Sequence, residues 1–155
     1  MSSVSIEKVL FVDDEAVLHA CLELRKEVFV GEQNVPIEEE LDEYDFLDVP
    51  CWHFVVFAPS STASSSSVIG TARYIVSDGK CKAQRVVVAK DARGTGVGRL
   101  LMEAIHVHAK EKGLSEVILG AQLVALPFYE RLAYEAYGPI FDDAGIDHRM
   151  MRRSL

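Results

Sequence analysis

The glycine-rich segment at residues 93–98, Arg-Gly-Thr-Gly-Val-Gly, limits the possible folds of this chain more than any other feature of the sequence. It follows the β-branched run at residues 86–88 and precedes the apolar, helix-favouring residues 99–105. A strand, a glycine loop and the start of a helix in this order are typical of an anion-binding site. Glycines allow backbone N–H groups to approach a ligand, and a helix N-terminus adds unpaired donors. The segment therefore predicts a ligand that carries a diphosphate.

The spacing around this segment argues against two other kinds of phosphate-binding loop. A P-loop requires Lys and then Ser or Thr after its last glycine, whereas Arg99 and Leu100 occupy those positions. A dinucleotide-binding loop requires a glycine at position 99 and an acidic residue at the end of the next strand, whereas Glu116 precedes the apolar residues 117–119. The remaining R-x-x-G-x-G pattern does not predict binding of GTP or NAD.

The composition is that of one globular domain. The chain has 155 residues, of which 49% are hydrophobic and 26% charged, and we expect residues 1–155 to form a single domain. The net charge of −8 argues against nucleic-acid and anionic-membrane partners. We find no apolar run near the roughly 20 residues of a membrane span and no signal peptide. Cys21, Cys51 and Cys81 are odd in number and widely spaced, so we expect reduced thiols, no metal and a cytoplasmic location, with a nuclear one also compatible.

Strand and helix patterns alternate along the chain and predict an α/β (α+β) fold. The expected helices cover residues 15–30, with Asp13 or Asp14 as the cap, 98–113 and 124–132. The expected strands cover residues 5–11, 52–58, 68–76, 82–89, 116–120, 134–138 and 148–152. Residues 59–67 are rich in serine, and we expect them to form a flexible loop within the domain.

Four segments resemble those of one enzyme family. Residues 93–98 resemble the acyl-coenzyme-A loop of the GCN5-related N-acetyltransferases (the GNAT superfamily). Residues 125–134, Ala-Leu-Pro-Phe-Tyr-Glu-Arg-Leu-Ala-Tyr, are similar to its late A-x-x-F-Y-x-x-x-G-F motif, with Ala133 where glycine is usual. Residues 25–36 resemble the R-x-x-V-F-V-x-E-Q-x-x-P block of the small YjcF/ElaA-type acetyltransferases, and residues 141–151 resemble their F-x-D-A-G-I-x-H-x-x-M ending. The resemblance implies the GNAT fold, a central, mixed, mostly antiparallel and splayed sheet flanked by helices.

The resemblance also implies acetyl-CoA as the cosubstrate and an N-acetyltransferase reaction without a metal. A thioester is already an activated acyl donor, so an amine can attack it directly. Backbone N–H groups of Val86 and Val88 are our candidates for contacts with pantetheine and the thioester carbonyl. The full set of residues expected to bind acetyl-CoA is Val86, Val87, Val88, Arg93, Gly94, Thr95, Gly96, Val97, Gly98, Arg99, Phe128 and Tyr129.

Acetyl transfer requires an acid for the leaving thiolate and a base for the amine. Tyr129 matches the motif tyrosine that family members often use as the acid, although a tyrosine beside Phe128 also suits simple core packing. Glu32 is our first candidate for the base and His148 the second. The alternatives that stay open are Asp42, Asp45, His53 and a water relay without a single base.

The chemical class of the acceptor can be inferred only from the charged residues of the sequence. An acidic run at residues 38–48 would attract a cationic amine of a small molecule or peptide, whereas arginines would favour an anionic acceptor such as glucosamine 6-phosphate. The residues expected to bind the acceptor are Arg25, Phe29, Glu32, Gln33, Arg73 and Arg85. A homodimer is a further expectation, and a non-catalytic acyl-CoA sensor is the alternative from another functional class.

Overall fold

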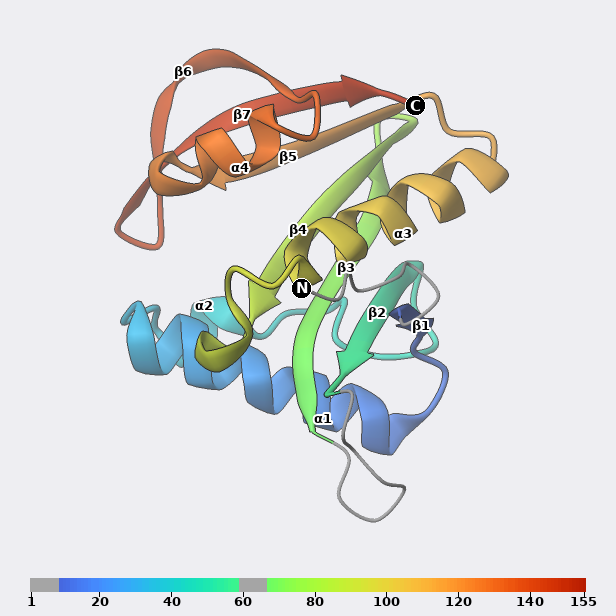
Figure 1. The fold of residues 1–155 in the computed structure, drawn as a ribbon, viewed down its shortest axis with the longest axis vertical. Helices are drawn as coiled ribbons and strands as arrows, with labels where there is room; N and C mark the ends of the chain where they lie inside the picture. Colours follow the sequence, from blue (N-terminus) through green and yellow to red (C-terminus); the bar gives the residue numbers. More distant parts are fainter. Residues whose placement is uncertain (1–8, 59–66) are drawn as a thin grey trace.

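A seven-stranded sheet forms the centre of the part of the chain that the computed structural model describes, residues 9–58 and 67–155. The strand order is β1-β2-β3-β4-β5-β7-β6, and every neighbouring pair is antiparallel except β4 and β5 (Figure 1). The strands are β1 (Val9–Phe11), β2 (Cys51–Phe57), β3 (Val68–Ser77), β4 (Lys80–Val88), β5 (Glu116–Gln122), β6 (Glu135–Asp143) and β7 (Ile146–Ser154). The expected mixed and mostly antiparallel sheet is confirmed.

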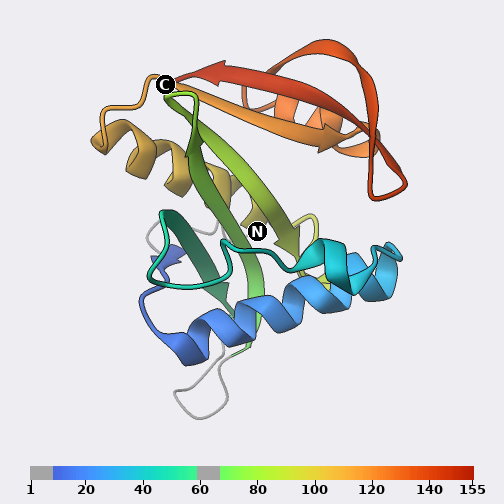
Figure 2. The same ribbon diagram turned by 180° about the vertical axis from the view of Figure 1, so that it is seen from behind.

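Helices cover both faces of this sheet. α1 and α2 lie on one face, and α3 and α4 lie on the other (Figures 1 and 2). The helical segments are α1 (Glu15–Arg25), η2 (Lys26–Glu32), α2 (Ile37–Glu40), η3 (Lys90–Ala92), α3 (Val97–Glu111), η4 (Leu123–Ala125) and α4 (Leu126–Glu130). The glycine segment thus joins the end of β4 to the start of α3, as the sequence predicts.

The first helix begins at its predicted cap but changes type before its predicted end. The side chain of Asp14 accepts hydrogen bonds from the N–H groups of Ala16 and Val17, at 2.9 and 3.1 Å. After Arg25 the backbone widens into the π-helical turns of η2, and the N–H of Gln33 donates to the carbonyl of Val28 at 3.0 Å. Hydrophobic spacing cannot separate these two helix types over one or two turns. Such widened turns are frequent at functional sites.

The main core lies between the sheet and α3. Leu101, Met102, Ile105 and Ala109 are fully buried, and their spacing of three and four residues places them on one helical face. The same cluster contains buried residues of β2, β3, β4, β5 and β7. The predicted amphipathic helix after the glycine loop is therefore correct. All three cysteines are buried and unpaired, as expected of reduced thiols.

The predicted boundaries differ from the observed ones late in the chain, at two segments that contain prolines. The helix expected over residues 124–132 is a 3-10 turn followed by the short α4, with Pro127 in its first turn. The strand expected to end at residue 138 continues as β6 to Asp143, and its register with β7 shifts between Tyr137 and Phe141, around Pro139. Residues 5–8 of the first expected strand and residues 59–66 of the expected flexible loop lie outside the described part.

Candidate active site

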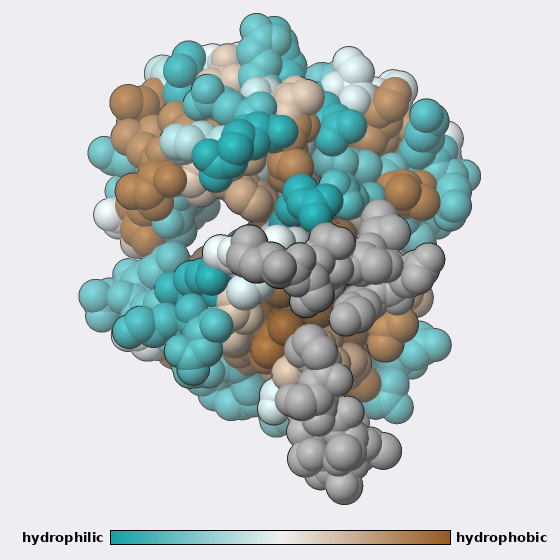
Figure 3. All heavy atoms as spheres, viewed as in Figure 1, coloured by the Kyte–Doolittle hydropathy of each residue, from teal (hydrophilic) through white to brown (hydrophobic). Residues whose placement is uncertain are grey.

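The sheet opens between β4 and β5. These two parallel strands pair only at Cys81 with Val117 and at Lys82 with Ile118, although β4 continues to Val88. Figure 1 shows the two strands diverging beyond this point, and Figure 3 shows the surface hollowed between the β6–α4 side and the α1 side. Strand β4 therefore has backbone groups on its open side that β5 does not pair. These groups are available to a ligand.

The glycine loop lies at the open end of β4 and has the geometry of an anion site. Gly94 and Gly96 have φ angles of 80° and 94°, a conformation that side-chain-bearing residues rarely adopt. Gly96 caps α3 without a side-chain hydrogen bond, so the first N–H groups of this 15-residue helix have no side-chain acceptor. The hydroxyl of Thr95 donates to the carbonyl of Ala92 and fixes the loop. A diphosphate fits this arrangement of free donors.

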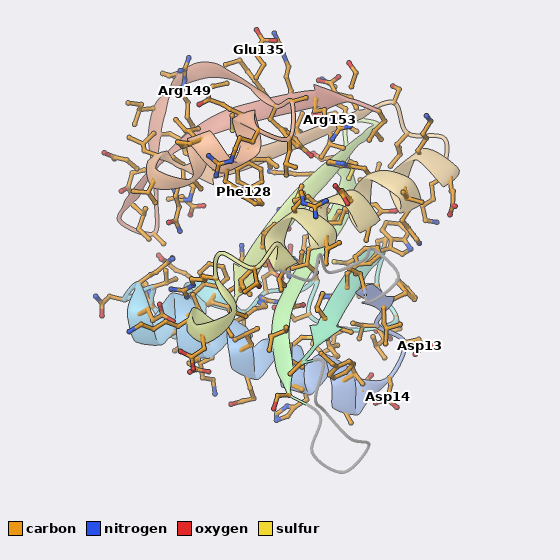
Figure 4. The ribbon with its side chains drawn as sticks, viewed as in Figure 1. Asp13, Asp14, Phe128, Glu135, Arg149 and Arg153 are labelled. Atoms are coloured by element: carbon orange, nitrogen blue, oxygen red, sulfur yellow. The ribbon has the colours of Figure 1, made fainter. Side chains whose placement is uncertain are left out.

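Phe128 packs directly on the start of α3. A Cβ atom added to Gly98 would lie 3.1 Å from Cζ of Phe128 and 3.7 Å from Cγ2 of Val88. Figure 4 shows Phe128 on α4. A side chain at position 98 would therefore force the Phe128 ring to shift by a few tenths of an ångström. The structure brings together three predicted segments, namely the end of β4, the glycine loop and α4.

Tyr129 is buried beside this contact. Its ring packs edge-to-face against Phe128 and Tyr134, with centroid distances of 4.9 and 5.6 Å. Burial raises the pKa of Tyr129, so its hydroxyl is a weaker acid than that of an exposed tyrosine and is protonated at neutral pH. This hydroxyl makes no hydrogen bond to any residue in the ranges 9–58 and 67–155. Its oxygen is also not completely enclosed by those residues. The ring of Tyr129 therefore packs in the core, while its hydroxyl is available as a proton donor.

Glu32 forms an ion pair with Arg93 of the glycine loop. Nη1 of Arg93 lies 2.9 Å from Oε1 of Glu32, and Nη2 donates to Oε2 at 3.0 Å. Nε of the same guanidinium donates to the carbonyl of Val88 at 3.1 Å. The hydrogen bond from Arg93 lowers the pKa of Glu32 and makes its carboxylate a weaker base. Glu32 therefore faces the diphosphate loop as the partner of a cation.

His148 lies on the other side of the opening, on β7. Its Nδ1 donates to the carbonyl of Ile146 at 2.7 Å, so the neutral ring has its lone pair on Nε2. The ring stacks on Phe141, and His148 is the cross-strand partner of Gln122 at the end of β5. Nε2 of Gln122 donates to Oε1 of Gln33 at 2.8 Å. The structure therefore brings Gln33 close to His148 through a residue that the sequence analysis missed.

A polar residue at the end of a strand beside the opening was the signal that could have identified Gln122. Ligands commonly bind where the carboxyl ends of parallel strands separate, and β5 is the parallel neighbour of β4. The predicted strand ends at residue 120, whereas β5 continues to Gln122. The two residues beyond the predicted end include Gln122, which contacts Gln33.

The acidic segment, residues 38–48, forms a buried ion-pair cluster with Arg25 and Arg73. Nε of Arg25 lies 2.7 Å from Oε1 of Glu40, and its Nη1 lies 2.5 Å from Oδ1 of Asp45. The two amino groups of Arg73 lie 2.8 Å from Asp45 and 2.6 Å from Asp42. Both arginine side chains are 2% exposed or less, so their donors are used inside the protein. In this structure both guanidinium groups are paired with carboxylates of the acidic segment, and their part in binding the acceptor stays a prediction.

The same cluster accounts for two of the alternative bases. Burial opposes the ionisation of Asp42 and Asp45, but hydrogen bonds from Arg73 to Asp42 and from Arg25 to Asp45 outweigh it and lower the pKa of each carboxyl. His53 is buried, its Nε2 donates to the carbonyl of Tyr44 at 2.9 Å, and burial lowers its pKa. These three residues are therefore occupied in packing the acidic segment onto the sheet.

The remaining predicted residues divide between core and surface. Phe29 packs against the small core of Leu24, Val28 and Val87 under α1. Val86 and Val88 pack against the main core under α3. Arg99 forms a half-exposed pair with Glu103 at 2.8 Å, one turn along α3. The side chain of Arg85 points to the acidic segment, where its Nε donates to the carbonyl of Glu40 at 3.2 Å.

Comparison with known proteins identifies the family. The profile described as "Acetyltransferase (GNAT) domain" matches residues 60–155. The chain is 37% identical to the "Uncharacterized N-acetyltransferase YjcF" of Bacillus subtilis over 147 residues, which cover 94% of this chain and 99% of that protein. The chain belongs to the GNAT family of acetyltransferases. The resemblance found in its motifs is confirmed.

Solved structures agree with this family and its fold. An acyl-CoA N-acyltransferase from Pseudomonas aeruginosa is 29% identical, with a TM-score of 0.79 over 94% of this chain and 97% of that one. ElaA from Escherichia coli is 25% identical, with a TM-score of 0.78 over 94% of this chain and 98% of that one. The GNAT fold and the expectation of an acetyl-CoA-dependent N-acetyltransferase are therefore confirmed. Within its described residues, this GNAT protein has no helix long and apolar enough to cross a membrane.

Proposed function

We propose that this GNAT protein transfers the acetyl group of acetyl-CoA to a primary amine of a small molecule or peptide. The observation that supports this most strongly is the open side of β4, which lies between an anion-binding loop and α4 with Tyr129. All 155 residues would act as one catalytic domain in the cytoplasm, and a homodimer remains part of the proposal.

The glycine loop would hold the diphosphate of acetyl-CoA. The free N–H groups at the start of α3 supply the donors, and Arg93, which is half-exposed and paired with Glu32, would turn its positive charge to the diphosphate. The open backbone at Val86 and Val88 would bind the pantetheine arm and the thioester carbonyl. Phe128 would limit the space beside the first turn of α3.

Tyr129 would supply the proton that the departing thiolate takes up. In the reaction, a bond forms between the amine nitrogen and the acetyl carbon, and the carbon–sulfur bond breaks. The electron pair of that bond goes to sulfur, and the Tyr129 hydroxyl donates the proton. A tyrosine hydroxyl is protonated at neutral pH, and no other described residue holds this one in a hydrogen bond.

His148 is a better candidate for the general base than Glu32. The lone pair on Nε2 of His148 is free in the neutral ring, because Nδ1 donates to Ile146. Glu32 is bound to Arg93, which lowers the pKa of its carboxyl. We therefore assign proton removal from the amine to His148 and place Gln33 and Gln122 beside the acceptor.

A cationic amine suits the exposed charges that remain near α2. Three acids of the segment, Glu40, Asp42 and Asp45, are paired with arginines, whereas Glu38, Glu39, Glu43 and Asp48 are exposed. Exposed acids of one sign raise the local concentration of cations. Glucosamine 6-phosphate would need free arginines, and Arg25 and Arg73 are already paired.

A thiol-release assay with a panel of amines tests the proposed function. Acetyl-CoA is mixed with spermidine, a lysine peptide, an aminoglycoside or glucosamine 6-phosphate, and free CoA is measured. We expect acceptor-dependent release with a cationic amine, and a decrease in kcat of about 100-fold in His148→Gln. His19→Gln is the control, because His19 is exposed on α1. Binding of acetyl-CoA without release for any amine would identify a non-catalytic sensor instead.

A further inference from the structure

Strand β4 contains a bulge at Arg85, directly before the backbone that faces the opening. Thr71 of β3 pairs with Val87 and Arg73 pairs with Gln84, so Ala72 alone faces two residues of β4, Arg85 and Val86. Arg85 has a φ angle of 56°, which is unfavourable for a residue with a side chain. A strained residue beside a functional site indicates that surrounding contacts hold it there.

The bulge changes which residues of β4 face α3. Ala83 packs in the main core, and regular alternation would place Arg85 and Val87 on the same face. Instead, Val86 and Val88 pack against that core, whereas Val87 is buried under α1. Because backbone N–H groups alternate in the same way, the bulge also decides which of them point toward the opening beside β5.

The side chain of Arg85 holds this bulge to the acidic segment. Nε of Arg85 donates to the carbonyl of Glu40 at 3.2 Å, and Nη2 donates to the carbonyl of Glu39 at 3.3 Å. Nη2 also lies 3.4 Å from Oδ2 of Asp42. The two carbonyls belong to the last residues of α2, where helical carbonyls lack an intrahelical partner. One guanidinium therefore connects the strained strand residue with three acceptors.

Two buried arginines, Arg25 and Arg73, hold the acidic segment in place. Glu40 is held by Arg25, and Asp42 and Asp45 are held by Arg73, through contacts of 2.6 to 2.8 Å. Three carboxylates and three guanidinium groups are thus in mutual contact, so their charges balance. A segment anchored in this way can resist movement of the bulge.

We propose that Arg85 is a positioning residue, which fixes the bulge of β4 and thereby the backbone of residues 86–88 that binds acetyl-CoA. This inference rests on the proposed function, since it assigns to the acidic segment a role in shaping the acyl-CoA site. Arg85 would act through the backbone and would touch neither the acetyl group nor the acceptor. The predicted role of Arg85 in binding the acceptor is replaced by this one.

Two variants of Arg85 and one control test the inference. Arg85→Met keeps the length of the side chain and removes its donors. Arg85→Gly also removes them but relieves the strain at positive φ. Lys82→Met removes a cation from the same strand, and the side chain of Lys82 makes no hydrogen bond or ion pair with the described part of the chain, although its backbone pairs with β3 and β5. Folding of each variant is checked by urea unfolding.

Hydrogen exchange of the amides of residues 86–88 is measured without ligand, and CoA affinity is measured by calorimetry. We expect both Arg85 variants to exchange faster and to bind CoA about tenfold more weakly, as for the loss of one or two ligand hydrogen bonds. Lys82→Met should match the wild type in both measurements. Wild-type exchange and affinity in Arg85→Met would overturn the inference. If Arg85→Met does not fold, an Arg85→Gly variant that binds CoA with wild-type affinity would overturn the inference.

The ligand-free exchange separates this inference from the proposed function. A wild-type protein that does not bind CoA refutes the proposed function, whatever the Arg85 variants do. A wild-type protein that binds CoA, with Arg85 variants whose amides exchange normally, refutes only the positioning role.

Discussion

Replacing Tyr129 with phenylalanine removes one hydroxyl and leaves the packing of the ring on Phe128 and Tyr134 intact. The hydroxyl has no hydrogen-bond partner among the described residues, so its loss leaves no buried group unsatisfied. We therefore expect the free energy of unfolding to change by less than about 1 kcal/mol. Loss of a general acid, in contrast, slows a reaction by about 100-fold or more, equal to at least about 2.7 kcal/mol of transition-state stabilisation.

Tyr134→Phe is the matched control, because the same substitution removes a hydroxyl that the fold uses. Arg153 donates to Nδ1 of His106, so the neutral ring of His106 donates from Nε2 to the Tyr134 hydroxyl at 2.5 Å. Loss of that acceptor leaves a buried N–H unpaired, which costs about 1–3 kcal/mol of stability. Urea unfolding and the thiol-release assay are run on both variants. We expect Tyr129→Phe to lose activity with its stability intact, and Tyr134→Phe to lose stability with its kcat intact. A fully active Tyr129→Phe across the pH range would refute the assignment of the acid.

Three further variants test other parts of the structure. Glu32→Gln keeps an acceptor for Arg93 but removes a negative charge beside the diphosphate loop. We expect CoA to bind a few-fold more tightly by calorimetry at low salt, and weaker binding would contradict this. Burial and the nearby Arg153 lower the pKa of His106 from 6.5 to about 4, so the unfolded state takes up a proton first as the pH falls. This residue should therefore remove about 3 kcal/mol of stability between pH 6.5 and 4, and urea unfolding of His106→Gln should show a flatter pH dependence. Ala133 has a φ of 68°, so Ala133→Gly should stabilise the fold by up to about 1 kcal/mol in urea unfolding, whereas destabilisation would show that the strain is small.

Local patterns predicted those parts of the fold that depend on neighbouring residues. The glycine loop, the buried face of α3 and the cap at Asp14 follow from spacing and residue type. The motif match also placed Phe128 and Tyr129 beside the loop, where the structure has them. The loop, the helix face and the cap are decided within one or two turns of chain, whereas the contact of Phe128 with residue 98 came only from the family motif.

Contacts between distant residues could not be predicted in the same way. Arg25 and Arg73 read as free cations in the sequence, because their partners Asp42 and Asp45 lie 20 to 31 residues away. The pairing of Glu32 with Arg93 spans 61 residues and changes the candidate base. The bulge at Arg85 depends on the same long-range contacts. Charge patterns show which residues need partners, but only the fold decides which partners they find.

Calorimetric titration of CoA and of 4′-phosphopantetheine into the folded wild-type protein tests the binding site most directly. The second ligand has the pantetheine arm and one phosphate but lacks the second phosphate and the 3′-phosphoadenosine, so the difference in affinity measures what the glycine loop at residues 93–98 and the adenosine part contribute together. We expect CoA to bind in the micromolar range and 4′-phosphopantetheine at least about 100-fold more weakly. Equal affinity for the two ligands, or no binding of CoA, would contradict a diphosphate site at the start of α3.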